Sequence, residues 1–295
     1  MSDSWCSIHI TCYTAFRRSW ILMKPLVVGT LSEDEVILEV KDLSVKRSGN
    51  LILKDINFSI KRGEFVGLVG PNGSGKSTLL LTLLGVLRSH QGSVTLYGHP
   101  PLSNRLIGKI GWVAQAAANL PKDIRITIRE LVRLGTINGK NMFRISDGGR
   151  RKRVDKAIQM VGLEDVQHRD IARLSGGQRQ RAIIARALAS ESEFILLDEP
   201  LVGIDRESRN SLLKLLDQLC HDEGKTILMV SHDLTAIRQT AHRMIFLEQT
   251  IRFDGISEEF PDLVQLANLR GIGAVHDGTD HVDHHHHHHH HHEEE

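Results

Sequence analysis

The phosphate-loop pattern G-x-x-x-x-G-K-[ST] begins at residue 70 and constrains the fold of this chain more than any other feature. The stretch consists of Gly70, Pro71, Asn72, Gly73, Ser74, Gly75, Lys76, Ser77 and Thr78. An apolar run at 65–69 precedes it and predicts a buried strand, and residues 78–87, which contain no proline, predict a helix. Strand, glycine loop and helix in this order are the context in which the pattern holds phosphate.

The residue types in this loop suit a nucleoside triphosphate. Glycines let backbone N–H groups turn inward at the helix N-terminus, where they form an anion site. We expect Lys76 to reach the β- and γ-phosphates and the Ser77 hydroxyl to ligate Mg²⁺. The alternative is a chance glycine-rich turn, which matches the pattern in about one chain in a hundred of this length. The loop therefore predicts ATP or a similar nucleotide, with Mg²⁺.

The composition excludes few classes of protein. Hydrophobic residues make up 40% of the 295 residues and charged residues 25%, as in ordinary globular proteins. A net charge of +1 produces no field that would attract nucleic acid, so no nucleic-acid partner is expected. Cys6, Cys12 and Cys220 are too few and too scattered for a disulfide framework, which fits a reducing cytosol.

Residues 1–34 differ from the rest and are predicted to form a disordered N-terminal extension. Their apolar segment, 20–28, is interrupted by Lys24 and Pro25 and is shorter than the roughly 20 residues that span a bilayer. A signal peptide is a weaker interpretation, because no small-residue cleavage site follows the segment. Translation from Met23 is the other alternative.

Periodicity predicts strands first, then helices, then both in alternation. Ile56, Phe58 and Ile60 alternate with polar residues as in a half-buried strand. Further strands are expected at 93–97 and 110–114, and helices between 116 and 172. Two helix faces are expected there; one comprises Ile128, Leu131, Val132 and Leu134, and the other Val154, Ala157, Ile158 and Val161. Residues 138–153 are predicted to be a surface loop, with the basic run 150–153 as a solvated helix start rather than a nucleic-acid contact.

From residue 175 onward helices and strands alternate. Helices are expected from 175 to 189 and at 208–219 and 234–240, and strands at 194–197, 226–230 and 244–247. Such alternation predicts a mostly parallel sheet covered by helices.

Further motifs place polar residues at the ends of these elements. Ser175 and Gly177 begin a helix and offer a second anion site. Asp198 and Glu199 follow a strand of four apolar residues, so Asp198 is expected to hold Mg²⁺ and Glu199 to polarise the attacking water. Plain solvated charge is the alternative for this pair.

Two other strand ends carry candidate ligands. His232 follows the strand at 226–230, where it would hydrogen-bond a γ-phosphate and the attacking water, although a lone histidine is usually structural. Gln115 follows the strand at 110–114 and offers a neutral ligand for Mg²⁺ and water.

Together these motifs resemble the ATP-binding-cassette (ABC) family, over about residues 36–260. The resemblance implies a P-loop NTPase (RecA-like) α/β core with a mostly parallel sheet, an antiparallel β subdomain and an inserted helical subdomain at about 116–172. It makes 35–260 the ATPase domain. By position, the Walker A loop is 70–77, the Q-loop residue Gln115, the signature 174–178, the Walker B residue Asp198, the catalytic base Glu199, the D-loop residue Asp205 and the switch histidine His232.

The family resemblance also implies partners. Two copies would form a head-to-tail dimer in which the signature residues Ser175 and Gly177 close on the partner's ATP. No span of apolar residues is present, so a separate membrane permease is expected, served by an extracytoplasmic solute-binding protein. The chain would then lie on the cytoplasmic face of the membrane. Where the family places an aromatic residue against adenine, this chain has Arg47, whose guanidinium plane can also stack on a base.

Several stretches are similar to the subfamily that drives zinc, manganese or iron uptake. They are Leu120-Pro121, Ile126-Thr127-Ile128, Glu199 to Asp205 and Ser231 to Leu234. A transporter of another substrate, an exporter, and a soluble ABC ATPase without a transport role are the alternatives.

The predicted C-terminal extension, 261–295, ends in a His-rich tail that would bind Zn²⁺ or Ni²⁺. Imidazole nitrogens suit these ions. The candidate ligands are His281, His284, His286, His288, His290 and His292. A purification tag is the alternative interpretation, although three glutamates follow the histidines.

Overall fold

The computed structural model of the chain describes residues 35–115, 125–137 and 148–261. The chain divides into two compact units, Met1–Glu35 and Val36–Glu295, and the architecture below belongs to the second. The N-terminal extension, the His-rich tail and parts of the helical region at 116–124 and 138–147 lie outside the described residues. The domain boundaries given above therefore stay predictions.

A small antiparallel sheet has the strand order β2-β1-β4. Its strands are β1 (Val36–Arg47), β2 (Asn50–Lys61) and β4 (Gln91–Leu96). Ser48 and Gly49, both with positive φ (49° and 83°), form the two-residue turn between β1 and β2, as a type I′ hairpin requires. Ile56, Phe58 and Ile60 of β2 are buried, which confirms the predicted strand.

The larger sheet has the order β5-β6-β7-β3-β8-β9. Its strands are β3 (Phe65–Val69), β5 (Ile110–Val113), β6 (Phe194–Asp198), β7 (Thr226–Val230), β8 (Arg243–Glu248) and β9 (Thr250–Ile256). All neighbours pair in parallel except β8 and β9, which are antiparallel. Since the parallel strands share one carboxyl edge, residues that follow β3, β5, β6 and β7 meet there.

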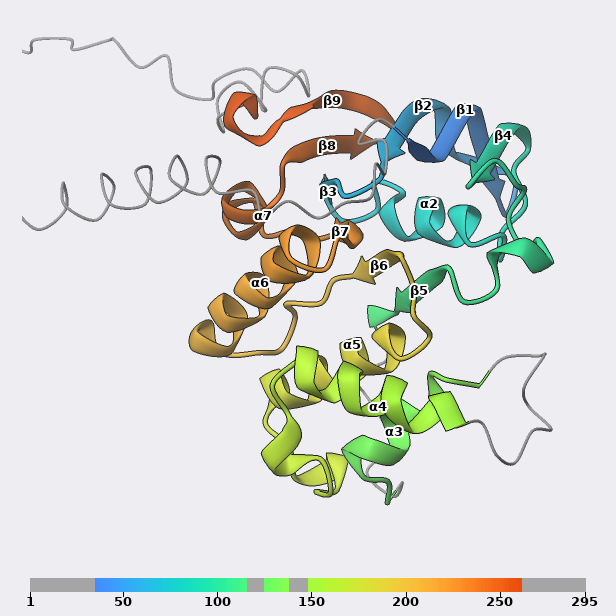
Figure 1. Cartoon of the computed structure of the whole chain (residues 1–295). Helices are drawn as coiled ribbons and strands as arrows, with labels where there is room; N and C mark the ends of the chain where they lie inside the picture. The colour runs from blue at the N-terminus through green and yellow to red at the C-terminus, as the bar shows by residue number, and fades with distance from the viewer. Residues whose placement is uncertain (1–34, 116–124, 138–147, 262–295) are drawn as a thin grey trace, which may run out of the picture. The chain divides into compact units, whose positions relative to one another are not determined.

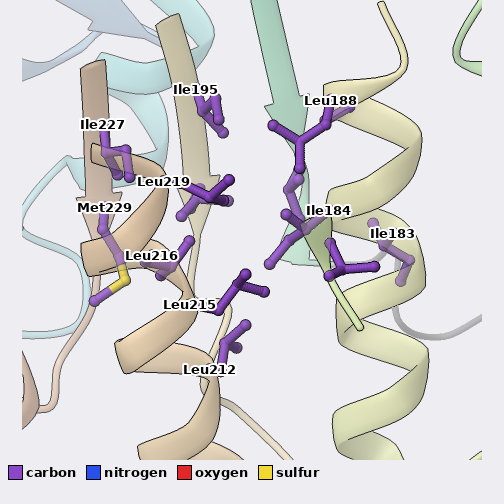
Figure 2. Close-up of a cluster of buried hydrophobic side chains, with 14 of the residues drawn as sticks. Ile183, Ile184, Leu188, Ile195, Leu212, Leu215, Leu216, Leu219, Ile227 and Met229 are labelled. Carbon is purple, nitrogen blue, oxygen red and sulfur yellow. The ribbon is translucent and has the colours of Figure 1, made fainter. Parts of the chain in front are cut away.

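Both faces of the larger sheet are covered at its centre, where β3, β6 and β7 are buried at every position. On β3, Phe65 and Val69 pack into one hydrophobic cluster while Val66 and Leu68 pack into the other. The first cluster lies against α5 (Gly176–Leu188), α6 (Arg206–His221) and α7 (Leu234–Thr240). Figure 2 shows side chains of α5 and α6 pointing toward one another and toward Ile195, Ile227 and Met229. The second cluster joins the sheet to α2 (Lys76–Leu83) and the antiparallel sheet.

The remaining helices form a group around α5. They are α3 (Ile128–Leu134) and α4 (Gly148–Met160), with short 3₁₀ turns at Glu164–Val166 and Ile171–Arg173. Both helices contact α5 and each other (Figure 1). Two further 3₁₀ turns, Asn104–Leu106 and Ser257–Glu259, connect other elements. The parallel core, antiparallel subdomain and added helices confirm the predicted fold class. None of the helices in the described part of the chain is long and apolar enough to cross a bilayer.

Three details of the sequence prediction were wrong. Gly148 and Gly149, predicted to be loop, already belong to α4, whereas the basic run 150–153 lies near the start of this helix as predicted. Strand β9 was not predicted, although Ile251 and Phe253 alternate with polar residues as a strand requires. Leu134 is 50% exposed while Ile128 and Leu131 are buried, because six residues along a helix correspond to a rotation of about 240° from Ile128.

Candidate nucleotide site

The glycine loop between β3 and α2 has the backbone that the sequence predicted. Gly73 (φ 80°) and Gly75 (φ 102°) both adopt the left-handed region that glycine enters without strain. A Cβ on Gly75 would also lie 2.5 Å from Cδ2 of Leu53, so β2 leaves no room for a side chain there. Backbone conformation and packing therefore both require glycine at this helix start.

Lys76 is held inside the loop by the backbone. Its Nζ donates to the carbonyl oxygens of Gly70 (2.8 Å) and Pro71 (2.9 Å). Burial lowers the pKa of Lys76, and the nearby carboxylates of Glu199 and Asp198 oppose that shift. An ammonium group has three N–H donors, so one remains for a phosphate oxygen.

A pocket of about 470 Å³ opens beside the loop, within the size range of small-molecule sites. The residues that line it are Arg47, Ile52, Asn72, Gly73, Gly75, Lys76, Ser77, Thr78, Gln115, Glu199, Val202 and His232. The structure thus brings the candidate residues of β1, the loop, β5, β6 and β7 to one place. Ile52 and Val202 were not predicted, because an apolar residue in a strand or loop carries no motif of its own.

Asp198 ends β6 behind this pocket and is largely buried. Burial raises its pKa, the neighbouring Glu199 adds to the rise, and Lys76 and a hydrogen bond with Ser77 oppose it. Its Oδ1 is buried and has no hydrogen-bond partner among the described residues. The unpaired carboxylate oxygen has the hydroxyl of Ser77 beside it, and Ser77 and Gln115 line the same pocket. These residues offer hard oxygen donors, which fit Mg²⁺.

Glu199 and His232 contact each other across the ends of β6 and β7. Nδ1 of His232 lies 2.8 Å from Oε2 of Glu199, and the backbone N of His232 lies 3.4 Å from the same oxygen. Glu199 N donates to Val230 O at 3.0 Å, which ties the two strand ends together. Glu199 has a positive φ of 51°, a strained conformation for a residue with a side chain. The fold therefore fixes the direction of this carboxylate.

Arg209 and Asp233 hold the segment that carries His232, and the sequence analysis did not find them. Arg209 Nη1 donates to Asp233 Oδ2 at 2.7 Å, which joins α6 to the start of α7. Oδ1 of Asp233 accepts from the backbone N of Ala236 at 3.0 Å and caps α7. An acidic residue directly before the first helical residue, Leu234, could have indicated the cap, but not the partner on α6.

The signature and D-loop residues do not line this pocket. Ser175 caps α5 by accepting from Gln178 N at 3.2 Å, and Asp205 caps α6 by accepting from Ser208 N at 2.9 Å. A Cβ on Gly177 would lie 2.5 Å from Cβ of Ser208, so the two helix starts pack closely in the same chain. Gly70, Pro71 and Ser74 are also not among the residues that line the pocket, although Gly70 and Pro71 hold Lys76.

Comparison with known proteins places the chain in one family. The profile described as ABC transporter matches residues 53–202. The zinc uptake system ATP-binding protein ZurA of Listeria innocua is 39% identical over 224 residues, which are 76% of this chain and 87% of ZurA. The manganese transport system ATP-binding protein MntB of Halalkalibacterium halodurans is 35% identical over 230 residues, covering 77% of this chain and 90% of MntB.

A solved structure of a dimeric ATP-binding cassette in a post-hydrolysis state, bound to ADP and Pi, has the same fold. It is 32% identical, with a TM-score of 0.63, and the match covers 76% of this chain and all of that cassette. The chain therefore belongs to the ABC transporter family, as an ATPase that uses ATP and Mg²⁺.

Proposed function

We propose that this chain hydrolyses ATP to drive the uptake of a metal ion, zinc or manganese, through a separate membrane permease. The observation that supports a metal ion as the transported substrate is the similarity of this chain to ZurA and MntB over three quarters of its length. The chain would act at the cytoplasmic face of the membrane, and an extracytoplasmic solute-binding protein would deliver the ion to the permease. The histidines of the tail, 281–292, remain a predicted site for Zn²⁺ or Ni²⁺.

In this proposal the pocket holds the nucleotide from base to γ-phosphate. The guanidinium plane of Arg47 stacks on adenine at the pocket wall. The amides of the loop and the free donor of Lys76 bind the β- and γ-phosphates. Ser77, Asp198 and Gln115 would hold Mg²⁺, which when bound neutralises charge on the phosphate oxygens.

Glu199 is the proposed general base. Its carboxylate reaches the pocket from the end of β6, so it can accept a proton from water beside the γ-phosphate. His232 keeps the carboxylate in place through the 2.8 Å contact at Nδ1 and offers its other ring nitrogen to the γ-phosphate or the water. The contact between Glu199 and His232 is the structural feature that supports these roles.

The signature residues act on a second nucleotide in this proposal. Ser175 and Gly177 start α5 outside the pocket of their own chain, and the solved relative is a dimer. A head-to-tail homodimer would place them, and Asp205 of the D-loop, against the ATP that the partner's pocket holds. Each ATP site would then contain the Walker A loop of one copy and the signature of the other.

Ser175→Arg tests this arrangement. The variant should bind ATP normally as a single chain, because its own pocket is intact, but its turnover should fall at least about 100-fold, since arginine blocks the partner's γ-phosphate. Mixing it with a Lys76→Met chain should restore turnover, because only the mixed dimer contains one intact site. A steady-state ATPase assay measures both effects. Normal turnover by Ser175→Arg alone would exclude the head-to-tail dimer.

The cargo is tested in cells that lack this chain. Uptake of radioactive zinc or of manganese should fall and should return with the wild-type chain but not with Glu199→Gln. Uptake of a non-metal nutrient serves as the control. Unchanged uptake of both metals would contradict the proposed cargo, and increased accumulation of one metal would identify an exporter.

A further inference from the structure

A cluster of potential metal ligands lies outside the nucleotide pocket, at the other end of β3. It consists of Cys220 and His221, the last residues of α6, and His242, which directly precedes β8. One potential ligand atom from each lies within 4.8 Å of the others. We propose that Cys220, His221 and His242 form a binding site for Zn²⁺ or a divalent cation of similar chemistry. This inference does not depend on the cargo proposed above.

The spacing of the two imidazoles suits a tetrahedral ion. Nε2 of His242 lies 3.3 Å from Nε2 of His221. Two nitrogens bound to one tetrahedral Zn²⁺ at about 2.0–2.1 Å are separated by roughly 3.3 Å. A thiolate and two imidazoles complete three of the four positions and leave one for water, and these ligands favour zinc, cobalt or nickel over magnesium.

His221 is oriented as a metal ligand by an outer partner. Its Nδ1 lies 3.0 Å from the backbone oxygen of Asp217 and 3.3 Å from Oδ1 of the same residue. These acceptors hold the proton on Nδ1, so the lone pair of Nε2 faces the cluster. Such a histidine with a carboxylate or carbonyl behind it is the usual second shell of a metal site.

The cation must displace existing hydrogen bonds. Cys220 Sγ donates to Gly63 O at 3.2 Å, and burial raises the pKa of this thiol to about 12, so binding releases the thiol proton to solvent. His242 Nδ1 accepts from Phe65 N at 3.2 Å, which leaves the proton of the neutral ring on Nε2. Binding at Nε2 moves that proton to Nδ1, and the ring turns away from the amide. The site therefore binds more weakly than a preformed one.

The cluster connects three elements of the fold. Gly63 and Phe65 stand at the beginning of β3, the strand that leads into the phosphate loop. Cys220 and His221 are the last residues of α6, and Asp205 caps the other end of this helix. A bound cation would therefore fasten the end of α6 to the start of β8 and release these two contacts with the start of β3, without contact with the nucleotide pocket.

Cobalt spectroscopy on the reduced, full-length chain tests the site. Co²⁺ should produce a thiolate-to-cobalt charge-transfer band in the near ultraviolet and intense visible bands of four-coordinate cobalt, and excess Zn²⁺ should remove both. The His-rich tail has no sulfur and cannot produce the charge-transfer band. Cys220→Ser should abolish that band while its hydroxyl still donates to Gly63 O. The double variant Cys6→Ser/Cys12→Ser is the matched control and should retain it.

Two further variants measure the imidazoles. His242→Asn keeps an acceptor for the amide of Phe65 but removes Nε2, and should weaken cobalt binding more than about 100-fold. Asp217→Asn should weaken it about tenfold, because the backbone oxygen of residue 217 still orients His221. The proposal is overturned if the wild-type chain lacks the charge-transfer band, if Cys220→Ser retains it, or if His242→Asn develops this band at the same cobalt concentrations as the wild-type chain.

Discussion

Glu199→Gln should bind MgATP as tightly as the wild-type chain and hydrolyse it about 10³-fold more slowly. The amide has nearly the shape of the carboxylate and still accepts a hydrogen bond from His232, but it cannot accept a proton from water. Removing a general base lowers a rate by about 10²–10⁴-fold. Because the bound nucleotide is not consumed, the variant should also accumulate as a dimer. A steady-state ATPase assay and size-exclusion chromatography with MgATP measure the two effects.

Glu223→Gln is the matched control for this prediction. Glu223 is an exposed glutamate that pairs with Lys156 at 3.1 Å and does not line the pocket. Its neutralisation should change turnover less than about twofold, since a surface ion pair contributes little. If Glu199→Gln hydrolyses ATP at the wild-type rate, Glu199 is not the base. Loss of ATP binding in this variant would instead assign the carboxylate a role in holding the nucleotide.

Most of the α/β core was predictable because its signals are local. Thr226–Val230 and Leu234–Thr240 are bounded as the sequence predicted, since the first is a mostly apolar run between Lys225 and Ser231 and the second begins directly after the polar cap Asp233. The strand order was not predicted, because the placement of β3 between β7 and β8 depends on pairing across about 160 residues of chain. The first residues of α4 were missed because here the local signal is misleading. Gly148 and Gly149 are poor helix formers in isolation.

The part of the candidate site whose chemistry demands particular residue types could be predicted from sequence motifs. Lys76, Glu199 and His232 line the pocket as expected, because the ends of parallel strands meet at one edge. The contact of Arg209 with Asp233 was not predictable, since it joins side chains 24 positions apart that match no pattern. The cluster of Cys220, His221 and His242 was not predictable for the same reason. The spacing between its members has no metal-site signature, and only the tertiary fold brings the end of α6 beside His242.

Lys76→Met should weaken MgATP binding about 10³-fold. Methionine nearly preserves the length of the side chain but removes the charge and the one donor that is free to reach the phosphates. A hydrogen bond to a charged group contributes about 1.5–3 kcal/mol, roughly 10–150-fold in affinity, and the loss of the positive charge beside the β- and γ-phosphates adds to it. Titration calorimetry measures the change. The temperature of thermal unfolding should also fall, because the carbonyls of Gly70 and Pro71 lose their hydrogen-bond donor.

Lys225→Met separates nucleotide binding from stability. Lys225 is also partly buried, also has a pKa lowered by burial, and donates to the carbonyl of Ser192 at 2.8 Å, but it does not line the pocket. Its replacement should lower stability to a similar degree and leave ATP affinity unchanged. Arg47→Ala should weaken ATP binding only about tenfold, the contribution of one cation–π contact. Equal losses of affinity in the Lys76 and Lys225 variants would mean that Lys76 supports the fold of the loop and does not bind phosphate.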